Sequence, residues 1–295
     1  MLACLGACGE GGSSGGAEEP GTLALDFQPN AVHAGIYAAG GLEVRVPAAS
    51  TDSLKLLAAG RSDMSVVDIH DLGLAREQGA DVVGVGALVQ RPLAAVIARA
   101  GEIRTPRDLE GRRVGVTGLP SDEAVLRAVV EDDGGSFERV QRVTIGFSAV
   151  PSLISGRVDA VVSFWNAEGV ALRERGVRTR EFRVDEFGAP RYPELVLVVS
   201  RETLDERAEL VNAMLGEIAA GTRAALRDRD AIVTELAQAG GSDEELMRAQ
   251  LEAVAPALEP PVELDRAALE GWAEFDAEFG ILGARPDVDR AFELD

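Results

Sequence analysis

The chain has few of the residues on which most enzyme and nucleic-acid-binding sites depend. Lys55 is the only lysine, which argues against Schiff-base chemistry and against a phosphate loop built on a lysine. The two histidines, His33 and His70, and the two cysteines, Cys4 and Cys8, do not stand at zinc-ligand spacing. Because 50 acidic residues oppose 29 basic ones, the formal net charge is −21, which argues against a nucleic-acid partner.

Long hydrophobic runs are also absent, and aromatic residues make up only 4% of the chain. Without a run of about 18 apolar residues, the sequence predicts no membrane-spanning helix. With 295 residues, of which 46% are hydrophobic, the chain can bury a full core as one large domain or two ordinary ones. Because aromatic side chains are so scarce, each one near a predicted pocket is a candidate for contact with a ligand.

The first 21 residues have the composition of a leader remnant followed by a tether. Leu5 to Cys8 has the form of a bacterial lipobox, in which a branched apolar residue and two small residues precede a cysteine that receives lipid. The stretch from Gly9 to Gly21 is rich in Gly, Ser and Glu and cannot bury a core. We therefore expect residues 1–21 to hold the protein outside the cytoplasm, attached to the membrane only through lipid on Cys8. The alternative is an incidental free cysteine in a disordered tail.

From Thr22 onward, apolar strand-like segments alternate with helical ones. We expect strands at residues 23–27, 42–46, 64–67, 82–89, 113–116, 139–145, 160–164 and 195–200. We expect helices at residues 32–39, 53–59, 72–78, 122–132 and 149–155, and from residue 204 to the end. Strands separated by helices predict an α/β protein with parallel pairing and right-handed crossovers.

Four segments carry a resemblance to one protein family. Residues 25–37, LDFQPNAVHAGIY, resemble the first strand and loop of the pyrimidine-precursor branch of the ABC-transporter substrate-binding proteins, which is related to yeast thiamine-pyrimidine synthase and to the bacterial formylaminopyrimidine-binding protein. Residues 54–63 and 108–115 resemble turn motifs that most such binding proteins share. Residues 164–169, FWNAEG, resemble an aromatic-plus-Glu-Gly loop of the pyrimidine branch.

The resemblance implies a periplasmic-binding-protein type II fold, in which two α/β lobes are joined by two crossing segments and close on a ligand. Lobe 1 would comprise residues 22–91 and 196–295, and lobe 2 would comprise residues 92–195. The crossings would lie near residues 90–94 and 193–196. The implied function is delivery of a thiamine pyrimidine precursor, or a similar heteroaromatic, to an ABC importer. Such a protein is not an enzyme, needs no cofactor, works with permease and ATPase subunits and is expected to be a monomer.

The ligand-binding candidates follow predicted strands, where ligands sit in open α/β sheets. Candidates in the N-terminal half are Phe27, Asn30, His33, Ser50, Thr51, Asp68, His70 and Gln90. Asn30, Ser50 and Thr51 have the alternative role of helix caps, and His33 that of a histidine bonded to the backbone. Of Asp68 and His70, we expect one to face the cleft. Together with Asp71 they also suggest acid–base or metal chemistry, for which no further ligand is close in sequence.

The sharpest candidates in the second half are Trp165, as a stacking face, and Glu168, as an acceptor for an amino-pyrimidine edge. Their alternative roles are a Trp packed between lobe helices and an exposed Glu. The same region adds three further candidates to the predicted site, namely Thr117, Asn166 and Tyr192.

The sequence departs from the family pattern in one segment, and two other functions are compatible with parts of it. The chain is about seven to ten residues shorter than the family pattern between Tyr37 and the second strand. Riboflavin, sulfonate or nitrate would keep the fold and change the ligand, and Arg91 and Arg191 adjoin the crossings where an anion would need them. A pyrimidine-synthase-like enzyme would need iron-linked cysteines, and no cysteine follows Cys8.

Overall fold

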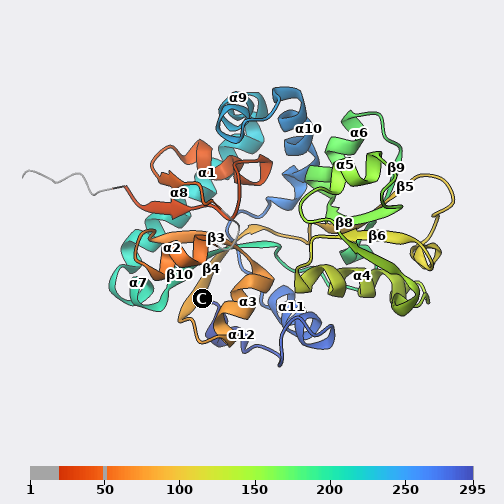
Figure 1. Cartoon of the computed structure of the whole chain (residues 1–295). Coiled ribbons are helices and arrows are strands. Elements are labelled where there is room, and N and C mark those ends of the chain that lie inside the picture. Colours follow the sequence, from red (N-terminus) through yellow and green to blue (C-terminus); the bar gives the residue numbers. More distant parts are fainter. Residues whose placement is uncertain (1–19, 49–51, 295) are drawn as a thin grey trace, which may run out of the picture.

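The computed structural model describes residues 20–48 and 52–294, and it divides the strands between two five-stranded sheets (Figure 1). The first sheet has the order β2-β1-β3-β10-β4 and is made of β1 (Thr22–Ala24), β2 (Glu43–Arg45), β3 (Met64–Asp68), β4 (Val82–Val89) and β10 (Leu195–Ser200). The second has the order β7-β6-β8-β5-β9 and is made of β5 (Ala94–Arg99), β6 (Arg113–Val116), β7 (Gln141–Thr144), β8 (Ala160–Phe164) and β9 (Thr179–Arg183). We call the parts built on these sheets lobe 1 and lobe 2.

The chain passes between the lobes twice. β4 ends at Val89 and β5 begins at Ala94 in the other sheet, so residues 90–93 form the first crossing. β9 ends at Arg183 and β10 begins at Leu195, so residues 184–194 form the second crossing.

Both sheets are mixed, and the expectation of parallel pairing is wrong for two strands. β1, β2 and β3 pair in parallel, as do β6, β7 and β8, whereas β10 runs antiparallel to β3 and β4, and β5 runs antiparallel to β8 and β9. The reason is the crossing itself. β10 enters lobe 1 at the end where β3 and β4 finish, since Leu195 stands opposite Asp68 and Val89. A strand that enters there must run back along its neighbours.

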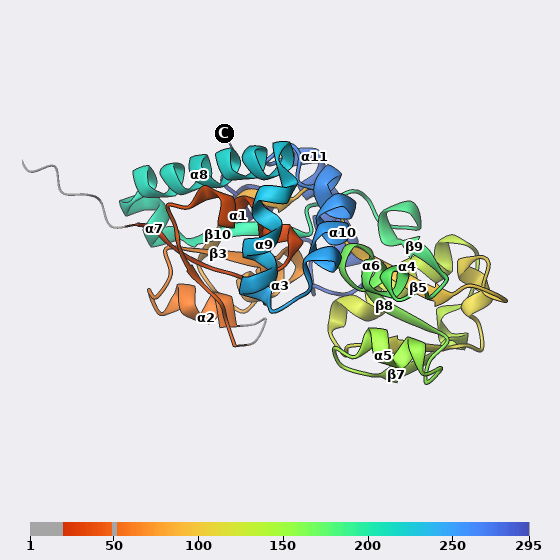
Figure 2. The same cartoon turned by 90° about the horizontal axis from the view of Figure 1, so that it is seen from above.

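The helices are α1 (Ala34–Ala39), α2 (Asp52–Ala58), α3 (Ile69–Glu77), α4 (Pro120–Asp132), α5 (Ala149–Ile154), α6 (Val170–Glu174), α7 (Arg201–Glu206), α8 (Ala208–Arg227), α9 (Arg229–Gly240), α10 (Glu244–Val254), α11 (Arg266–Glu278) and α12 (Val288–Ala291). The long helix α8 runs along one side of lobe 1 (Figure 2). The short helix α1 packs on α8 so closely that a Cβ on Gly221 would lie 2.1 Å from the Gly35 carbonyl oxygen. Only glycine fits at such a contact. Among the described residues, no helix combines the length and apolarity that a membrane span requires.

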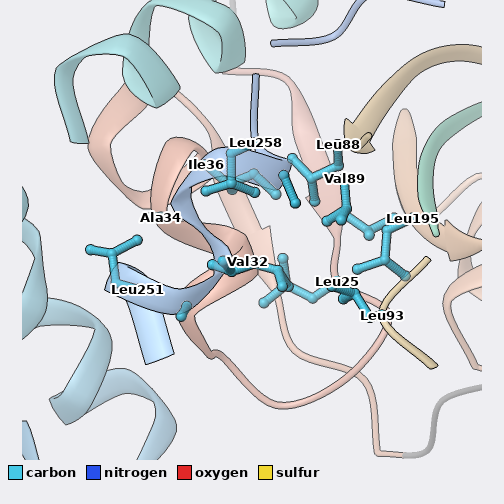
Figure 3. Packing of buried hydrophobic residues seen from close by; sticks show 14 of the residues in the cluster. Leu25, Val32, Ala34, Ile36, Leu88, Val89, Leu93, Leu195, Leu251 and Leu258 are labelled. Atoms are coloured by element: carbon cyan, nitrogen blue, oxygen red, sulfur yellow. The ribbon is translucent and has the colours of Figure 1, made fainter. Parts of the chain in front are cut away.

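The alternation of side chains along β10 explains how the two cores form. Leu195, Leu197 and Val199 belong to one buried cluster, and Val196 and Val198 belong to the other, because successive side chains point to opposite faces. Helices cover both faces, so the strand is apolar throughout. The first cluster includes Leu93 of the first crossing, which lies beside Leu25 and Leu195 (Figure 3). The crossing is therefore anchored in the core.

Candidate functional site

A cavity of about 180 Å³ lies between the lobes, at the carboxyl ends of β3, β6 and β8 and in the loops after β1 and β7. Lobe 1 contributes Phe27, Asp68 and His70, the crossings contribute Glu194, and lobe 2 and its first strand contribute Ala94, Thr117, Leu119, Ser121, Asp122, Val125, Gly146, Phe147, Ala149, Val162, Ser163, Phe164 and Glu168. A crevice beyond the carboxyl ends of strands is where open α/β sheets bind ligands. Five of the predicted residues meet here, namely Phe27, Asp68, His70, Thr117 and Glu168.

The lobe 1 wall is built at the junction of β3 and α3. We expected residues 68–71 to form a loop. Instead, the Asp68 carboxylate caps α3 by accepting the His70 backbone N–H at 2.8 Å, and His70 lies in the first turn of the helix. His70 Nδ1 lies 2.7 Å from Asp276 Oδ1 on α11, and both side chains are buried.

The charge on His70 follows from these neighbours. Burial alone would lower the pKa of His70, but the Asp276, Asp68 and Glu194 carboxyl groups together raise it to about 10. The ring is therefore an imidazolium at neutral pH. The pKa of Asp68 is raised well above its ordinary value, first by burial and then by Glu194 and Asp71, while His70 acts in the opposite direction.

Glu194 adds a second carboxyl group between the lobes and is 2% exposed. Its Oε2 accepts the Leu93 backbone N–H at 2.6 Å. Burial raises the pKa of Glu194, whereas the nearby His70 imidazolium and hydrogen bonds from the backbone of Leu93 and Ala94 lower it. A hydrogen-bond donor on a ligand would stabilise the ionised form of this group.

The lobe 2 wall presents one carboxyl group and one hydroxyl group with capacity to bind. Glu168 lies in the π-helical turn η4 (Trp165–Gly169), and its Oε2 accepts the Phe164 backbone N–H at 3.1 Å. Burial raises the pKa of Glu168, with backbone hydrogen bonds from Glu168 itself and Phe164 acting against it. The Ser163 hydroxyl is buried and has no hydrogen-bond partner within the described parts of the chain. A buried unpaired hydroxyl that lines a cavity is suited to contact a ligand.

Thr117 and Asp122 shape the loop after β6. Asp122 Oδ2 accepts the backbone N–H groups of Thr117 and Gly118, at 2.6 and 3.0 Å, as well as the Thr117 hydroxyl. The Asp122 carboxylate is thus engaged in hydrogen bonds within the loop. It holds the cavity wall in place.

Two aromatic rings from opposite lobes face each other at the cavity. Phe27 follows β1 and Phe147 follows β7, with ring centroids 6.0 Å apart and ring planes inclined by 29°. They are 44% and 73% exposed, which is unusual for large apolar side chains. A planar ring stacked between them needs about 7 Å, twice a van der Waals contact of about 3.5 Å. If the two rings moved apart by about 1 Å, a planar ring would fit between them.

Asn30 and His33 do not line the cavity but support the loop that carries Phe27. Asn30 Oδ1 caps the turn Ala31–His33 by accepting the Val32 backbone N–H at 3.1 Å, which is the alternative role stated for it. His33 is fully buried, with Nε2 2.7 Å from Asp26 Oδ1. Direct contact of either residue with a ligand stays a prediction that this arrangement does not support.

Trp165 is engaged in packing between the crossings and lobe 2 and does not line the cavity. The indole Nε1 donates to the Pro92 carbonyl at 3.0 Å, and the side chain is 2% exposed. The Arg183 guanidinium lies 4.0 Å from the ring centroid and that of Arg91 lies 5.7 Å from it. Two guanidinium groups therefore lie over the ring, where a ligand was expected to stack. The adjacent Asn166 is also buried, and its Oδ1 has no partner among the described residues.

Gln90 and Tyr192 belong to the crossings and lie outside the cavity lining. Gln90 Nε2 donates to the carbonyls of Pro260 and Glu263, at 2.5 and 3.0 Å, so it fixes the first crossing to lobe 1. Tyr192 is fully buried against His70, at a ring separation of 5.3 Å. Ser50, Thr51 and Cys8 lie outside the described residues.

Among the cavity residues that the sequence-based prediction did not include are Phe147, Glu194 and Ser163. Phe147 follows β7 and could have been found by the same rule that identified Phe27, since both come shortly after a strand. Glu194 could have been noticed as a lone carboxylate before the apolar segment Leu195–Val199. Ser163 is a small polar residue inside a strand, and the sequence carries no sign of the face to which it points.

A comparison with protein families gives a match over residues 30–232 to the model described as NMT1/THI5 like. The chain belongs to the NMT1/THI5-like family. It is 35% identical over 201 residues to the formylaminopyrimidine-binding protein of Halalkalibacterium halodurans, a match that covers 64% of this chain and 61% of that protein. It is 30% identical over 206 residues to a putative thiamine biosynthesis protein of Haemophilus influenzae, covering 65% of each chain. The chain thus matches less than two thirds of the length of these curated relatives.

Solved structures share the fold of this family member at low identity. The periplasmic aliphatic sulphonate binding protein SsuA of Escherichia coli superposes with a TM-score of 0.76 and 18% identity, covering 92% of this chain and 97% of that one. The desulfurization enzyme DSZB superposes with a TM-score of 0.64 and 17% identity, covering 92% and 96%. The fold is therefore the type II periplasmic-binding-protein fold, which carries both binding proteins and an enzyme.

Proposed function

We propose that this protein is a solute-binding component of an ABC importer that binds a thiamine pyrimidine precursor, or a similar heteroaromatic amine, between its lobes. The observation that carries the proposal is the combination of two facing aromatic rings with carboxyl groups. Phe27 and Phe147 supply apolar faces for a planar ring. Asp68, Glu168 and Glu194 supply acceptors for amino groups at its edge.

The charge of the cavity supports an amine-bearing ligand over an anion. Among the described residues, no arginine or lysine lines the cavity, and the imidazolium of His70 is already paired with Asp276. The two arginines that adjoin the crossings are engaged elsewhere. Arg91 Nη2 lies 2.7 Å from Asp185 Oδ2, and Arg191 Nε lies 3.7 Å from the same atom. A sulfonate or nitrate would therefore meet carboxyl groups without a guanidinium to offset them.

An enzymatic role is the second candidate, because DSZB has this fold. Asp68 and His70 are the acid–base groups that such a role would use. His70 Nδ1 is 2.7 Å from Asp276, and the Asp68 carboxylate accepts the backbone N–H that begins α3. Both groups are thus committed to structural contacts, which supports binding without chemistry.

Transport would proceed by closure of the lobes on the ligand, followed by delivery to permease and ATPase subunits. The similarity of the chain to a formylaminopyrimidine-binding protein favours a small heteroaromatic as the cargo. We extend the proposal to location. The protein would act as a monomer outside the cytoplasm, held to the membrane by lipid on Cys8, with residues 1–21 as leader remnant and tether.

The proposal is tested by titrating the full chain with formylaminopyrimidine, hydroxymethylpyrimidine, riboflavin, taurine and nitrate in a calorimeter. We expect binding of the aminopyrimidines and no heat with taurine or nitrate. Saturation at 100 times the dissociation constant should add about 2.7 kcal/mol to the free energy of unfolding. Binding of taurine or nitrate in preference to the pyrimidines would overturn the assignment of the ligand while leaving the fold intact.

A further inference from the structure

Glu194 lines the cavity, belongs to the second crossing and is hydrogen-bonded through its side chain to the first crossing. It is the last residue of the second crossing, and its backbone N–H donates to the Val89 carbonyl at the end of β4 at 3.0 Å. Its own carbonyl accepts the Ile69 N–H at the start of α3 at 3.1 Å. The backbone of Glu194 is therefore fixed to lobe 1 on two sides.

The side chain of Glu194 reaches across to the first crossing. Oε2 accepts the Leu93 N–H at 2.6 Å, while the carboxyl group also lines the cavity. A hydrogen bond from an amide to an ionised carboxylate is roughly twice as strong as a bond between neutral groups. The same carboxyl group therefore faces the cavity and links the two crossings.

The bonds continue from Leu93 into lobe 2. The Leu93 carbonyl accepts the Trp165 N–H at 3.0 Å, and the Pro92 carbonyl accepts Trp165 Nε1 at 3.0 Å. Trp165 begins the turn η4, which also holds Glu168 on the opposite cavity wall. The first crossing is thus hydrogen-bonded to Glu194 on the lobe 1 side and to Trp165, in the turn that carries Glu168, on the lobe 2 side.

We propose that Glu194 is a positioning residue that couples occupancy of the cavity to the relative placement of the two lobes. A ligand amino group that donates to the Glu194 carboxyl group would contact the same side chain that accepts the Leu93 N–H, so the ligand and the first crossing would be held by one residue. Glu168 contacts the same cavity but bonds only within lobe 2, to Phe164. Variants of Glu194 and Glu168 therefore distinguish coupling between the lobes from simple contact with the ligand. The ligand-dependent half of this inference rests on the proposed function, whereas the link between the crossings does not.

The ligand-free test measures the distribution of distances between spin labels on the two lobes. Cys4 and Cys8 are the only cysteines, so the full chain with both replaced by serine can carry labels at Arg61→Cys in lobe 1 and Glu138→Cys in lobe 2, which are exposed positions. We expect a broader distribution in Glu194→Ala than in the parent and no change in Glu168→Ala. Circular dichroism verifies that each variant is folded, and the near-isosteric Glu194→Gln serves if the alanine variant does not fold. Equal distributions in the parent and every folded Glu194 variant would overturn the inference.

The ligand test uses formylaminopyrimidine as the probe. We expect Glu194→Gln to bind about tenfold more weakly, since a charged acceptor becomes neutral, and to show an incomplete shift of the distance distribution at saturation. Glu168→Gln also loses affinity but completes the shift at saturation. A complete shift in saturated Glu194→Gln would contradict the coupling. If the parent chain binds no aminopyrimidine, the proposed function fails, and the ligand-free distributions still decide the role of Glu194.

Discussion

Replacing Phe147 by alanine should weaken binding of an aromatic ligand while leaving the fold unperturbed. The ring is 73% exposed in the ligand-free structure, so its removal costs little core packing. It lines the cavity and faces Phe27 at 6.0 Å, so a ring bound there covers it. Binding, and not folding, is therefore where the contribution of Phe147 should be measured.

The size of the effect follows from the area that a ligand would cover. Full burial of a Phe side chain is worth about 1.5–3 kcal/mol, and about a quarter of this ring is already covered. Stacking geometry adds about 0.5–1.5 kcal/mol. We expect a loss of about 2–3 kcal/mol, which is a roughly 30- to 150-fold rise in the dissociation constant.

Calorimetric titration with formylaminopyrimidine measures the effect, and two further variants interpret it. Phe147→Leu keeps most of the apolar area and removes the ring, so it should lose only the stacking part. Ile154→Ala removes an apolar side chain that is 41% exposed on the same lobe but does not line the cavity, and it should bind like the parent. A dissociation constant for Phe147→Ala within twofold of the parent value, in a folded protein, would show that the bound ligand does not cover Phe147.

Three further variants test the electrostatics and the crossings. The folded-state pKa of His70 is raised from 6.5 to about 10, so the stabilisation from its charge is complete below pH 6.5 and is lost as the pH rises toward 10. Urea titrations should therefore show a free energy of unfolding that declines between pH 6.5 and about 10, and His70→Gln should flatten this decline. The same decline in His70→Gln as in the parent would contradict the ion pair with Asp276. Burial raises the pKa of Glu168, so ionisation of this group in the folded protein is unfavourable to stability. Glu168→Gln should therefore melt at the same or a higher temperature at pH 7 while binding the pyrimidine more weakly. A lower melting temperature of this variant would contradict a destabilising charge on Glu168. Trp165→Phe removes the bond to the Pro92 carbonyl and should lower the free energy of unfolding by about 1–3 kcal/mol in urea titration, whereas an unchanged value would show that this bond is not stabilising.

Local patterns in the sequence predicted much of the fold. The strands at 82–89, 113–116, 160–164 and 195–200 have the same bounds in the structure, because each is a run rich in buried apolar residues with a polar residue next to at least one of its ends. β9 (Thr179–Arg183) was missed because Thr-Arg-Glu-Phe-Arg carries three charged residues and looks like a loop. It lies at the edge of its sheet, where charged residues are tolerated.

The candidate site was predicted only in part because its walls come from distant segments. The position of Phe27 and Asp68 after strands was enough to indicate a cavity. The partner of His70, however, is Asp276, 206 residues away, and no local pattern reports such a contact. Trp165 was expected to stack on a ligand because of its type and its loop. The guanidinium groups that lie over its ring instead belong to Arg91 in the first crossing and Arg183 in β9.

The claim that the cavity selects an amine-bearing aromatic ligand over an anion is tested most directly by a competition titration. The full chain is titrated with formylaminopyrimidine in the presence and absence of excess taurine, in parallel with the Phe27→Ala, Phe147→Ala double variant. We expect tight binding that taurine does not disturb and that the double variant loses. Displacement of the pyrimidine by taurine, or unchanged pyrimidine affinity in the double variant, would contradict it.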